Sequence, residues 1–242
     1  MNEYVNGNIN CPYIIESVTG DVNGDGVPDF IYLTGCSSPD TPFIQNITVV
    51  IHDGRTGRVV RIEPKENQGY QPTLFLGDFT GDGVDDILLS IYTGGSGATM
   101  YHYIYTDLMN QPRMIFDFEQ FNEDNQYSVN YMDNARVKVV DKSKNKTFII
   151  DISYKGKDYL DEIYDENGKL KEPIEGFVNP ISGLYPVDFD YNGTYELLIY
   201  QKIAGRYNAD AIGYILSYVN WDNDRFNVYD RQVVIFGSDD VS

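Results

Sequence analysis

Oxygen-bearing side chains recur at fixed spacing in three short stretches, each followed at once by an apolar run. Residues 21–29 carry side-chain oxygens at positions one, three, five and nine, with glycine at position six. Residues 78–86 repeat this pattern, and residues 188–196 repeat it less closely. Alternating carboxylate and amide oxygens, a carbonyl at position seven and a glycine that permits a tight bend suit a hard cation. The clustered carboxylates would repel one another without a cation, so the stretches predict calcium sites.

The expected calcium ligands are the side chains at positions one, three, five and nine and the backbone carbonyl at position seven. The first set is Asp21, Asn23, Asp25, Val27 and Asp29. The second set is Asp78, Thr80, Asp82, Val84 and Asp86. The third set is Asp188, Asp190, Asn192, Thr194 and Glu196. Tyr191 stands at position four of the third stretch, where the other two have glycine, and we expect this site to be weaker.

An EF-hand is the nearest alternative, and two features of the sequence argue against it. An EF-hand loop needs a bidentate glutamate at position twelve and a helix on each side. Position twelve is occupied here by Tyr32, Leu89 and Ile199, and the flanking segments are β-branched and aromatic without helical periodicity. Each loop is therefore expected to join two strands.

Length, composition and charge describe a chain rich in strand-forming residues. Its 242 residues suit one large β domain or two small ones, and 42% apolar with 14% aromatic residues can form a substantial core. The formal net charge of −19 makes nucleic acid and anionic membrane poor partners. No apolar run approaches the length of about 18 residues that a spanning helix needs, so no membrane insertion is expected.

The N-terminal region leaves two questions open. Residues 1–10 are polar and have neither the basic nor the apolar part of a secretory signal, so either a leader has been removed or the protein begins in the cytoplasm. Cys11 and Cys36 flank the first expected strand–loop–strand unit. A disulfide between them and two separate thiols are both compatible with the sequence.

The loops mark an internal repeat. They begin at residues 21, 78 and 188, so the intervals are 57 residues and 110 residues, and a missing copy is expected near Asp133. Expected strands of the first two units are 13–18, 29–33, 47–52 and 59–62, then 73–76, 87–93, 100–105 and 113–118. Those of the last two are 127–132, 136–140 and 147–153, then 183–187, 196–202, 211–219 and 226–236. A short helix is expected over 158–164.

Repeated four-stranded units of even length are typical of a β-propeller. The unit and its loop resemble the FG-GAP/VCBS repeat family, known from the propellers of integrin α-subunits. The residues that carry the resemblance are 20–29 and 77–86, which match the D-x-[DN]-G-D-G-x-x-D loop. The resemblance implies a calcium loop between the first and second strands of a blade. We therefore expect an all-β, propeller-like single domain, 1–242, with about four blades of four antiparallel strands at 11–68, 69–125, 126–180 and 181–238.

Other residues could carry chemistry, but a structural role explains each better. The glycine-rich segment 94–98 lacks the remaining residues of a phosphate loop or nucleophile elbow and is expected to be a turn. The two histidines, His52 and His102, occupy the third strand of their units. Acidic residues outside the loops are Glu119, Glu123, Asp124, Asp161, Glu162, Asp165 and Glu166. Aromatic residues that could form a binding surface are Tyr70, Tyr101, Tyr103, Tyr207 and Trp221.

The sequence favours a calcium-binding repeat protein, a non-enzymatic binding or surface module whose Ca²⁺ ions rigidify the blade loops. The alternative is a carbohydrate-binding lectin or carbohydrate-active enzyme on the same frame, and a third reading is a structural protein of a spore or cell surface. No catalytic residue is assigned, and the ligand would be a protein or a carbohydrate. Extracellular calcium sites bind at about 10⁻⁴–10⁻³ M, which favours a cell-surface, spore or extracellular location.

Overall fold

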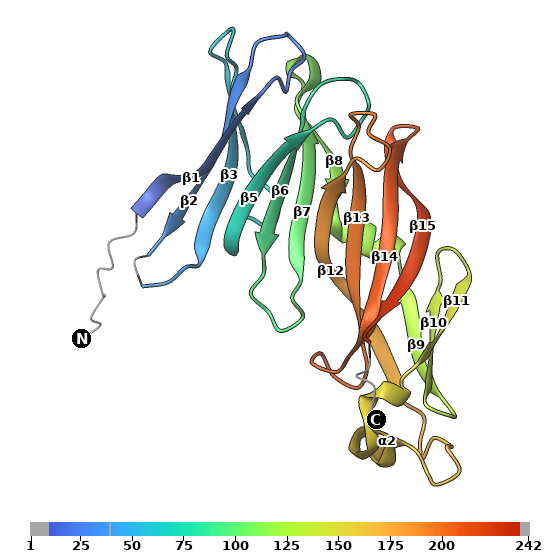
Figure 1. Ribbon diagram of the computed structural model, residues 1–242. Coiled ribbons are helices and arrows are strands. Elements are labelled where there is room, and N and C mark those ends of the chain that lie inside the picture. The colour runs from blue at the N-terminus through green and yellow to red at the C-terminus, as the bar shows by residue number, and fades with distance from the viewer. Residues whose placement is uncertain (1–9, 39, 238–242) are drawn as a thin grey trace, which may run out of the picture.

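The computed structural model describes residues 10–38 and 40–237 and shows an all-β protein built from antiparallel sheets (Figure 1). Its strands form two four-stranded sheets and one seven-stranded sheet. Strands occur at every segment where β-branched and aromatic residues predicted them, because these residues fit a pleated, half-buried surface.

The first sheet has the strand order β1-β2-β3-β4, in which each strand pairs with the next along the chain. Side chains alternate across it: Ile31 and Leu33 in β2 are completely buried, whereas Phe30 in the same strand is half exposed. The bounds are β1 (Asn10–Gly20), β2 (Asp29–Ser37), β3 (Ile44–His52) and β4 (Val59–Ile62).

The second sheet repeats this order as β5-β6-β7-β8 and is followed by a short helix. The sequence did not predict this helix, α1, which begins after Asp117; the Asp117 side chain caps it by accepting the N–H of Glu119. The bounds are β5 (Tyr70–Gly77), β6 (Asp86–Tyr92), β7 (Met100–Thr106), η1 (Leu108–Asn110), β8 (Arg113–Asp117) and α1 (Phe118–Asp124).

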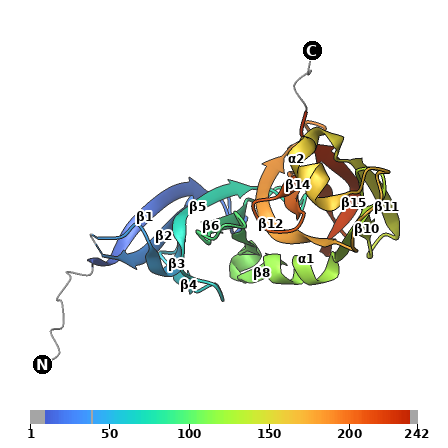
Figure 2. The same ribbon diagram turned by 90° about the horizontal axis from the view of Figure 1, so that it is seen from below.

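The third sheet has seven strands in the order β11-β10-β9-β12-β13-β14-β15 and curls into a nearly closed barrel, seen end-on in Figure 2. Its first part is β9 (Tyr127–Met132), β10 (Arg136–Asp141), β11 (Lys146–Asp151), η2 (Ser153–Lys155) and α2 (Lys157–Ile163). Its second part is β12 (Glu175–Val187), β13 (Glu196–Ala204), β14 (Ala211–Asp222) and β15 (Arg225–Ile235).

The third expected unit is not a separate sheet. Strand β12 pairs first with β9, through Glu175 and Gly176, and then with β13 from Phe177 onward. Gly176 permits this change of partner, because a Cβ there would lie 2.4 Å from the Ala204 carbonyl oxygen. The expected segments 126–180 and 181–238 are thus joined by one long strand. The helix expected over 158–164 is present as α2.

Side chains connect the two edges of the curled sheet. Lys146 in β11 donates to the Arg231 carbonyl in β15 over 2.9 Å. The buried Arg231 guanidinium pairs with the buried Asp141 carboxylate and donates over 3.0 Å to the Ser217 hydroxyl. A buried charge is tolerated when it is paired and hydrogen-bonded in this way. The strand edges are therefore joined by ion pairs and side-chain hydrogen bonds.

The molecule has two hydrophobic cores, and the boundary between them does not coincide with a boundary between sheets. The first core contains residues of the first two sheets together with Ile181, Leu184, Leu197, Ile199 and Val219 from β12–β14. The second core lies between β9–β11, α2 and the far ends of β13 and β14. Strands β12–β15 therefore pack against the second sheet on one side and against β9–β11 on the other.

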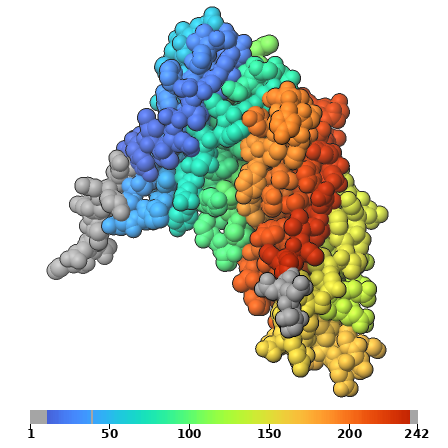
Figure 3. All heavy atoms as spheres, viewed as in Figure 1, coloured from blue at the N-terminus to red at the C-terminus, as the bar shows by residue number. Residues whose placement is uncertain are grey.

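The overall outline is an arch rather than a ring (Figure 3). The first sheet forms one limb, the curled sheet forms the other, and the second sheet lies between them. None of the helices among residues 10–38 and 40–237 has the length and apolar character needed to cross a membrane.

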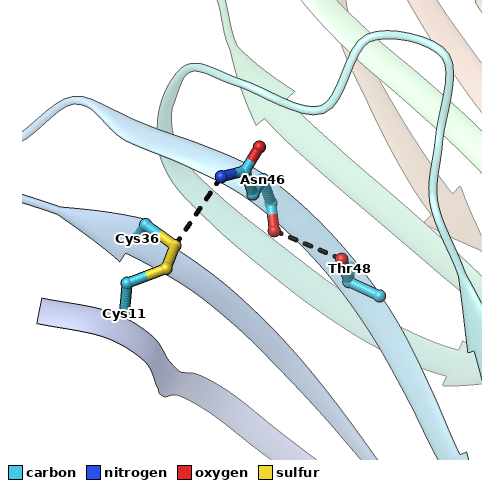
Figure 4. The surroundings of a disulfide bond; sticks show 4 residues. All are labelled: Cys11, Cys36, Asn46 and Thr48. Atoms are coloured by element: carbon cyan, nitrogen blue, oxygen red, sulfur yellow. Dashed lines mark hydrogen bonds between the residues drawn. A yellow bond between two sulfur atoms is a disulfide. The ribbon is translucent and has the colours of Figure 1, made fainter.

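A disulfide closes the first hairpin, which settles the question that the sequence left open. Cys11 in β1 is bonded to Cys36 in β2, with their Cα atoms 4.4 Å apart (Figure 4). Asn46 in β3 donates to the Cys36 sulfur over 3.7 Å. The β1–β2 hairpin is thus connected by a loop at one end and by a covalent bond at the other.

Candidate metal-binding loops

The three oxygen-rich stretches lie at the same end of their sheets, at the upper end of Figure 1. The first loop (residues 21–29) joins β1 to β2, the second loop (78–86) joins β5 to β6, and the third loop (188–196) joins β12 to β13. The Asp85 N–H donates to the Asp21 carbonyl over 3.1 Å, and the Tyr195 N–H donates to the Asp78 carbonyl over 2.7 Å. The loops therefore form one hydrogen-bonded row.

Position one of the first loop collects the backbone N–H groups of that loop. Asp21 accepts from Gly24 N–H at 2.8 Å through one carboxylate oxygen and from Gly26 N–H at 2.7 Å through the other. Both glycines have positive φ, 78° and 80°, a conformation that costs a residue with a side chain about 1–2 kcal/mol. Asn23 Oδ1 accepts from Asp25 N–H at 3.0 Å. The expected ligands thus shape the loop themselves.

Position nine of the first loop is a buried anchor. Asp29 is completely buried and accepts three hydrogen bonds, from Val22 N–H at 3.1 Å, from Asn23 Nδ2 at 3.3 Å and from Gly54 N–H at 2.9 Å. Two of these donors belong to the loop, and the third belongs to the turn between β3 and β4. Asp29 therefore fastens the loop to its own sheet.

An arginine from the same turn contacts a second expected ligand. Arg55 Nε lies 2.9 Å from Asp25 Oδ2, and the guanidinium also donates to the Asp25 carbonyl. The Arg55 side chain is 55% exposed, so water screens this pair and its net contribution is small. A cation bound by Asp25 would compete with this guanidinium for the same carboxylate.

The second loop repeats the main position-one contacts of the first loop and one of its three position-nine contacts. Asp78 accepts from Gly81 N–H at 2.6 Å and from Gly83 N–H at 2.8 Å. Asp86 is buried and accepts from Phe79 N–H at 3.1 Å, as Asp29 does from the residue at position two. Burial raises the pKa of Asp86 to about 7, and the hydrogen bond from Phe79 partly opposes this rise.

Position three of the second loop holds an oxygen without a partner. Thr80 Oγ1 is buried and makes no hydrogen bond. A buried hydroxyl in this state has lost its contact with water and gained nothing in return. Two residues further on, Asp82 Oδ1 accepts from Val84 N–H at 2.9 Å. Among the expected ligands in the described part of the chain, the Thr80 oxygen is the buried one without a hydrogen-bond partner.

The third loop keeps contacts of positions one and five, and at position five Asn192 Oδ1 accepts from Thr194 N–H at 2.7 Å. Asp188 accepts from Asn192 N–H at 3.1 Å and from Gly193 N–H at 3.0 Å. At position nine, Glu196 accepts instead from the hydroxyl of Tyr229 in β15, at 2.9 Å. This carboxylate therefore fastens the loop, through a side chain, to β15, which lies two strands away from β13 in the sheet.

Positions two and four also set the third loop apart. Phe189 at position two is 41% exposed, whereas Val22 and Phe79, its counterparts, are completely buried. Tyr191 at position four is 92% exposed and has a φ of 60°. The third loop therefore lacks a buried anchor and places a bulky residue where the other loops have glycine.

The donor chemistry of the loops suits a hard cation, although their carboxylates are not gathered around one point. All expected ligands are oxygens, and the Thr80 oxygen lacks a partner. Among the residues that the structure describes, no group of three or more His, Cys, Asp or Glu side chains has an arrangement that could hold a metal ion. The position-one carboxylates bind loop N–H groups in this conformation.

Comparison with known proteins places these loops in a family. The FG-GAP-like repeat family matches residues 21–89, which include the first and second loops. The YybI C-terminal domain family matches residues 125–234, from β9 to β15. An uncharacterized protein of Bacillus subtilis (strain 168), YybI, is 51% identical over 226 residues, which are 93% of this chain and 86% of that protein. The chain belongs to the YybI family, and its residues 21–89 match an FG-GAP-like repeat. No solved structure matches it.

The family assignment agrees with the division seen in the fold. The FG-GAP-like match ends in β6, and the YybI C-terminal match begins at the end of α1. The third loop lies within the YybI C-terminal part, although its hydrogen bond to Asp78 continues the row of the first two loops.

The two histidines have separate surroundings. His102 in β7 is buried, its Nδ1 lies 2.8 Å from Ser90 Oγ, and its Nε2 has no partner. Burial lowers the pKa of His102 to about 3, so the ring is neutral. His52 pairs with Phe30 across the first sheet, their ring centroids 6.3 Å apart. These contacts are cross-strand packing.

The remaining sequence candidates lie in turns, surface pairs and cores. Segment 94–98 is the turn between β6 and β7. Glu119 pairs with Lys65, and Glu162 lies 2.9 Å from Arg206. Among the aromatic candidates, Tyr103 is buried in the first core, whereas Tyr207 is 56% exposed. The aromatic candidates therefore do not form one surface.

A groove that the sequence did not predict lies where the second and third sheets meet. It has a volume of about 460 Å³ and is bordered by β8, α1, the β10–β11 turn and the start of β15. Its aromatic residues are Phe116, Phe121 and Phe226, and its polar residues include Asp124 and Asn227. These residues are spread over more than a hundred positions of the chain, so no local pattern brings them together.

Proposed function

We propose that this protein is a calcium-binding repeat protein whose ions rigidify the three loops, and that it acts as a non-enzymatic binding or surface module. The observation that carries the proposal is the recurrence of one oxygen-donor loop, each time between two adjacent antiparallel strands, at one end of three neighbouring groups of strands. The unpartnered Thr80 oxygen in the second loop supports it.

The same observation supports a propeller-like arrangement of these strands. We take β1–β4, β5–β8 and β12–β15 as three blades and β9–β11 as a reduced fourth unit that has lost its loop. The turn at Asp133, between β9 and β10, stands where a fourth loop would begin. The arch is then an open propeller, and β9–β11 cover the outer face of its last blade.

Calcium would act on this protein through stability. The chain's own residues supply carboxylate, amide, hydroxyl and carbonyl oxygens, and the cation would neutralise their mutual repulsion. An ion that binds only the native state adds about 2.7 kcal/mol per site at a hundredfold excess over its Kd. The Cys11–Cys36 disulfide supports an oxidising location such as a cell or spore surface.

Thermal unfolding with calcium and with a chelator tests this proposal. We expect millimolar calcium to raise the melting temperature by several degrees over chelator, since about 1 kcal/mol shifts the midpoint of a domain this size by about 2–4 °C. Asp25→Ala and Asp82→Ala should each reduce the rise. Asp161→Ala removes an exposed acid outside the loops and should leave it unchanged. An equal melting temperature in calcium and chelator would refute the proposal.

Carbohydrate binding is a second candidate function, and the groove favours it. Sugars present apolar C–H faces that stack on aromatic rings and hydroxyls that bind carboxylates and amides, and the groove offers Phe226 beside Asn227 and Asp124. Titration with tetrasaccharides of β-linked glucose and N-acetylglucosamine should show binding that Phe226→Ala abolishes. Tyr207→Ala, which alters an exposed ring outside the groove, should bind normally. No binding to any tetrasaccharide would remove this candidate.

A further inference from the structure

Hydrogen-bonded peptide groups join the third loop to the second and the second loop to the first, and each connection includes expected ligands of both loops. We propose that these connections couple the loops, so that calcium bound at one loop raises the calcium affinity of the next. This inference rests on the proposed calcium function and concerns its regulation.

The connection from the second loop to the first begins at the peptide between Val84 and Asp85. Its carbonyl is the expected position-seven ligand of the second loop, and its N–H donates to the Asp21 carbonyl over 3.1 Å. The peptide that accepts this bond, between Asp21 and Val22, donates its own N–H over 3.1 Å to Asp29 Oδ2. Asp29 is the expected position-nine ligand of the first loop. Two peptides and two hydrogen bonds therefore join a ligand of one loop to a ligand of the next.

The third and second loops are joined in the same way. The peptide between Thr194 and Tyr195 carries the expected position-seven carbonyl of the third loop, and its N–H donates to the Asp78 carbonyl over 2.7 Å. The peptide between Asp78 and Phe79 then donates over 3.1 Å to Asp86 Oδ2, the expected position-nine ligand of the second loop. The same pair of hydrogen bonds therefore occurs at both contacts between neighbouring loops.

The row ends at the first loop. Position eight is Tyr195 in the third loop and Asp85 in the second, and each donates the linking N–H. Position eight of the first loop is Pro28, which has no N–H to donate. The chain therefore carries the donor in both loops that have a neighbour to receive it and lacks it in the loop at the end of the row.

Burial strengthens the second hydrogen bond of each connection, the one that ends on the position-nine carboxylate. Val22 and Phe79 are completely buried, as is Asp29, while Asp86 is 1% exposed. Hydrogen bonds shielded from water are electrostatically stronger, and consecutive bonds polarise one another. A cation on the Val84 carbonyl would make the Asp85 N–H a better donor and hold the peptide of Asp21 in place.

The sign of the coupling follows from two opposing effects. Fixing the peptide of Asp21 orders positions one and nine of the first loop before its ion arrives, which lowers the ordering cost of binding. Repulsion between two divalent ions acts in the opposite direction, but water and salt screen it at exposed loops. We therefore expect positive coupling, with a factor of about 5–10 in affinity.

The coupling is tested by placing proline, the residue at position eight of the first loop, at position eight of the second loop. Asp85→Pro removes the linking N–H and reproduces at position eight of the second loop the residue found at position eight of the first. Asp85→Ala is the matched control, because it removes the same carboxylate and keeps the N–H; Asp85 is not an expected ligand. Both variants are made with Asp188→Ala, so that only the first two loops bind, and are titrated with calcium by calorimetry after removal of metal.

Positive coupling predicts a cooperative titration for the Asp85→Ala protein. For the Asp85→Pro protein it predicts two independent sites, the first loop binding about 5–10 times more weakly. Identical titrations of the two proteins would overturn the coupling and leave the calcium function intact. Failure of the unsubstituted protein to bind calcium would overturn both.

A reciprocal measurement serves if Asp85→Pro does not fold. Coupling in binding is necessarily symmetric, so disabling the first loop must weaken the second by the same factor. The Asp25→Ala protein should therefore bind calcium at its second loop about 5–10 times more weakly than a protein whose first loop is intact. An unchanged affinity at the second loop would overturn the coupling.

Discussion

The second and third loops share a sequence pattern but are held in place differently. In the second loop, Phe79 is buried in the first core and Asp86 is buried beneath the loop, where it accepts the Phe79 N–H. In the third loop, Phe189 is exposed, and Glu196 binds the Tyr229 hydroxyl instead. The comparison shows that a loop can have the oxygen pattern without the buried contacts that hold it. The third loop has most of the oxygens but lacks buried residues at positions two and nine.

We expect the largest difference in unfolding free energy between the two loops at position two. Phe79→Ala should lower the free energy of unfolding by about 3–5 kcal/mol, because it empties a completely buried site in the core. Phe189→Ala should cost well under about 1 kcal/mol, because the ring is 41% exposed. Urea unfolding in the presence of chelator measures both. Equal losses would mean that the third loop is anchored as firmly as the second.

Position nine offers a smaller contrast between the first loop and the third. Asp29→Ala should cost about 2–3 kcal/mol in chelator, because it leaves the buried N–H of Val22 and the N–H of Gly54 without an acceptor. Glu196→Ala removes one contact of a partly exposed carboxylate and should change stability by no more than about 0.5 kcal/mol. The same unfolding experiment decides, and a large loss for Glu196→Ala would contradict the distinction.

We expect substitutions at position four to have the smallest effect on stability. One of them should also increase the calcium affinity of the third loop. Tyr191 has a left-handed backbone conformation, which glycine adopts without strain. Tyr191→Gly should therefore raise stability by about 0.5–1 kcal/mol, with a few-fold gain in calcium affinity at that loop. Gly81→Ala, at a φ of 76° in the second loop, should lower stability by a similar amount. Calorimetric calcium titration and thermal unfolding measure the pair. A loss of affinity on Tyr191→Gly would show that the tyrosine ring itself contributes.

The loops and most strands could be predicted from the sequence because their signals are local. A strand such as Val59–Ile62 follows from β-branched residues beside a turn, and its observed bounds equal the expected ones. The joining of β9 to β12 could not be predicted, because it depends on the pairing of Gly176 with Val129 across a long intervening segment. Pairing of this kind is fixed by the assembled core and by a close backbone approach, neither of which leaves a periodic signal.

Some features of the loops could be predicted from the sequence, whereas the contacts that hold them in place could not. The sequence indicated which oxygens are the expected ligands. It gave no sign that Asp29 also accepts the Gly54 N–H from another turn, or that Phe226 and Phe121 border one groove. Such contacts join residues far apart in the chain, so they become visible only once the sheets are placed.

The disulfide at the base of the first hairpin has a mechanical consequence. Cys11 and Cys36 are separated by 25 positions, and the first loop lies within that covalent ring. Tension applied at the N-terminus passes from Cys11 directly to Cys36 and onward along the chain toward β3. The strands and loop inside the ring bear no load, so the first loop would keep its shape in a protein tethered by its N-terminal end and pulled.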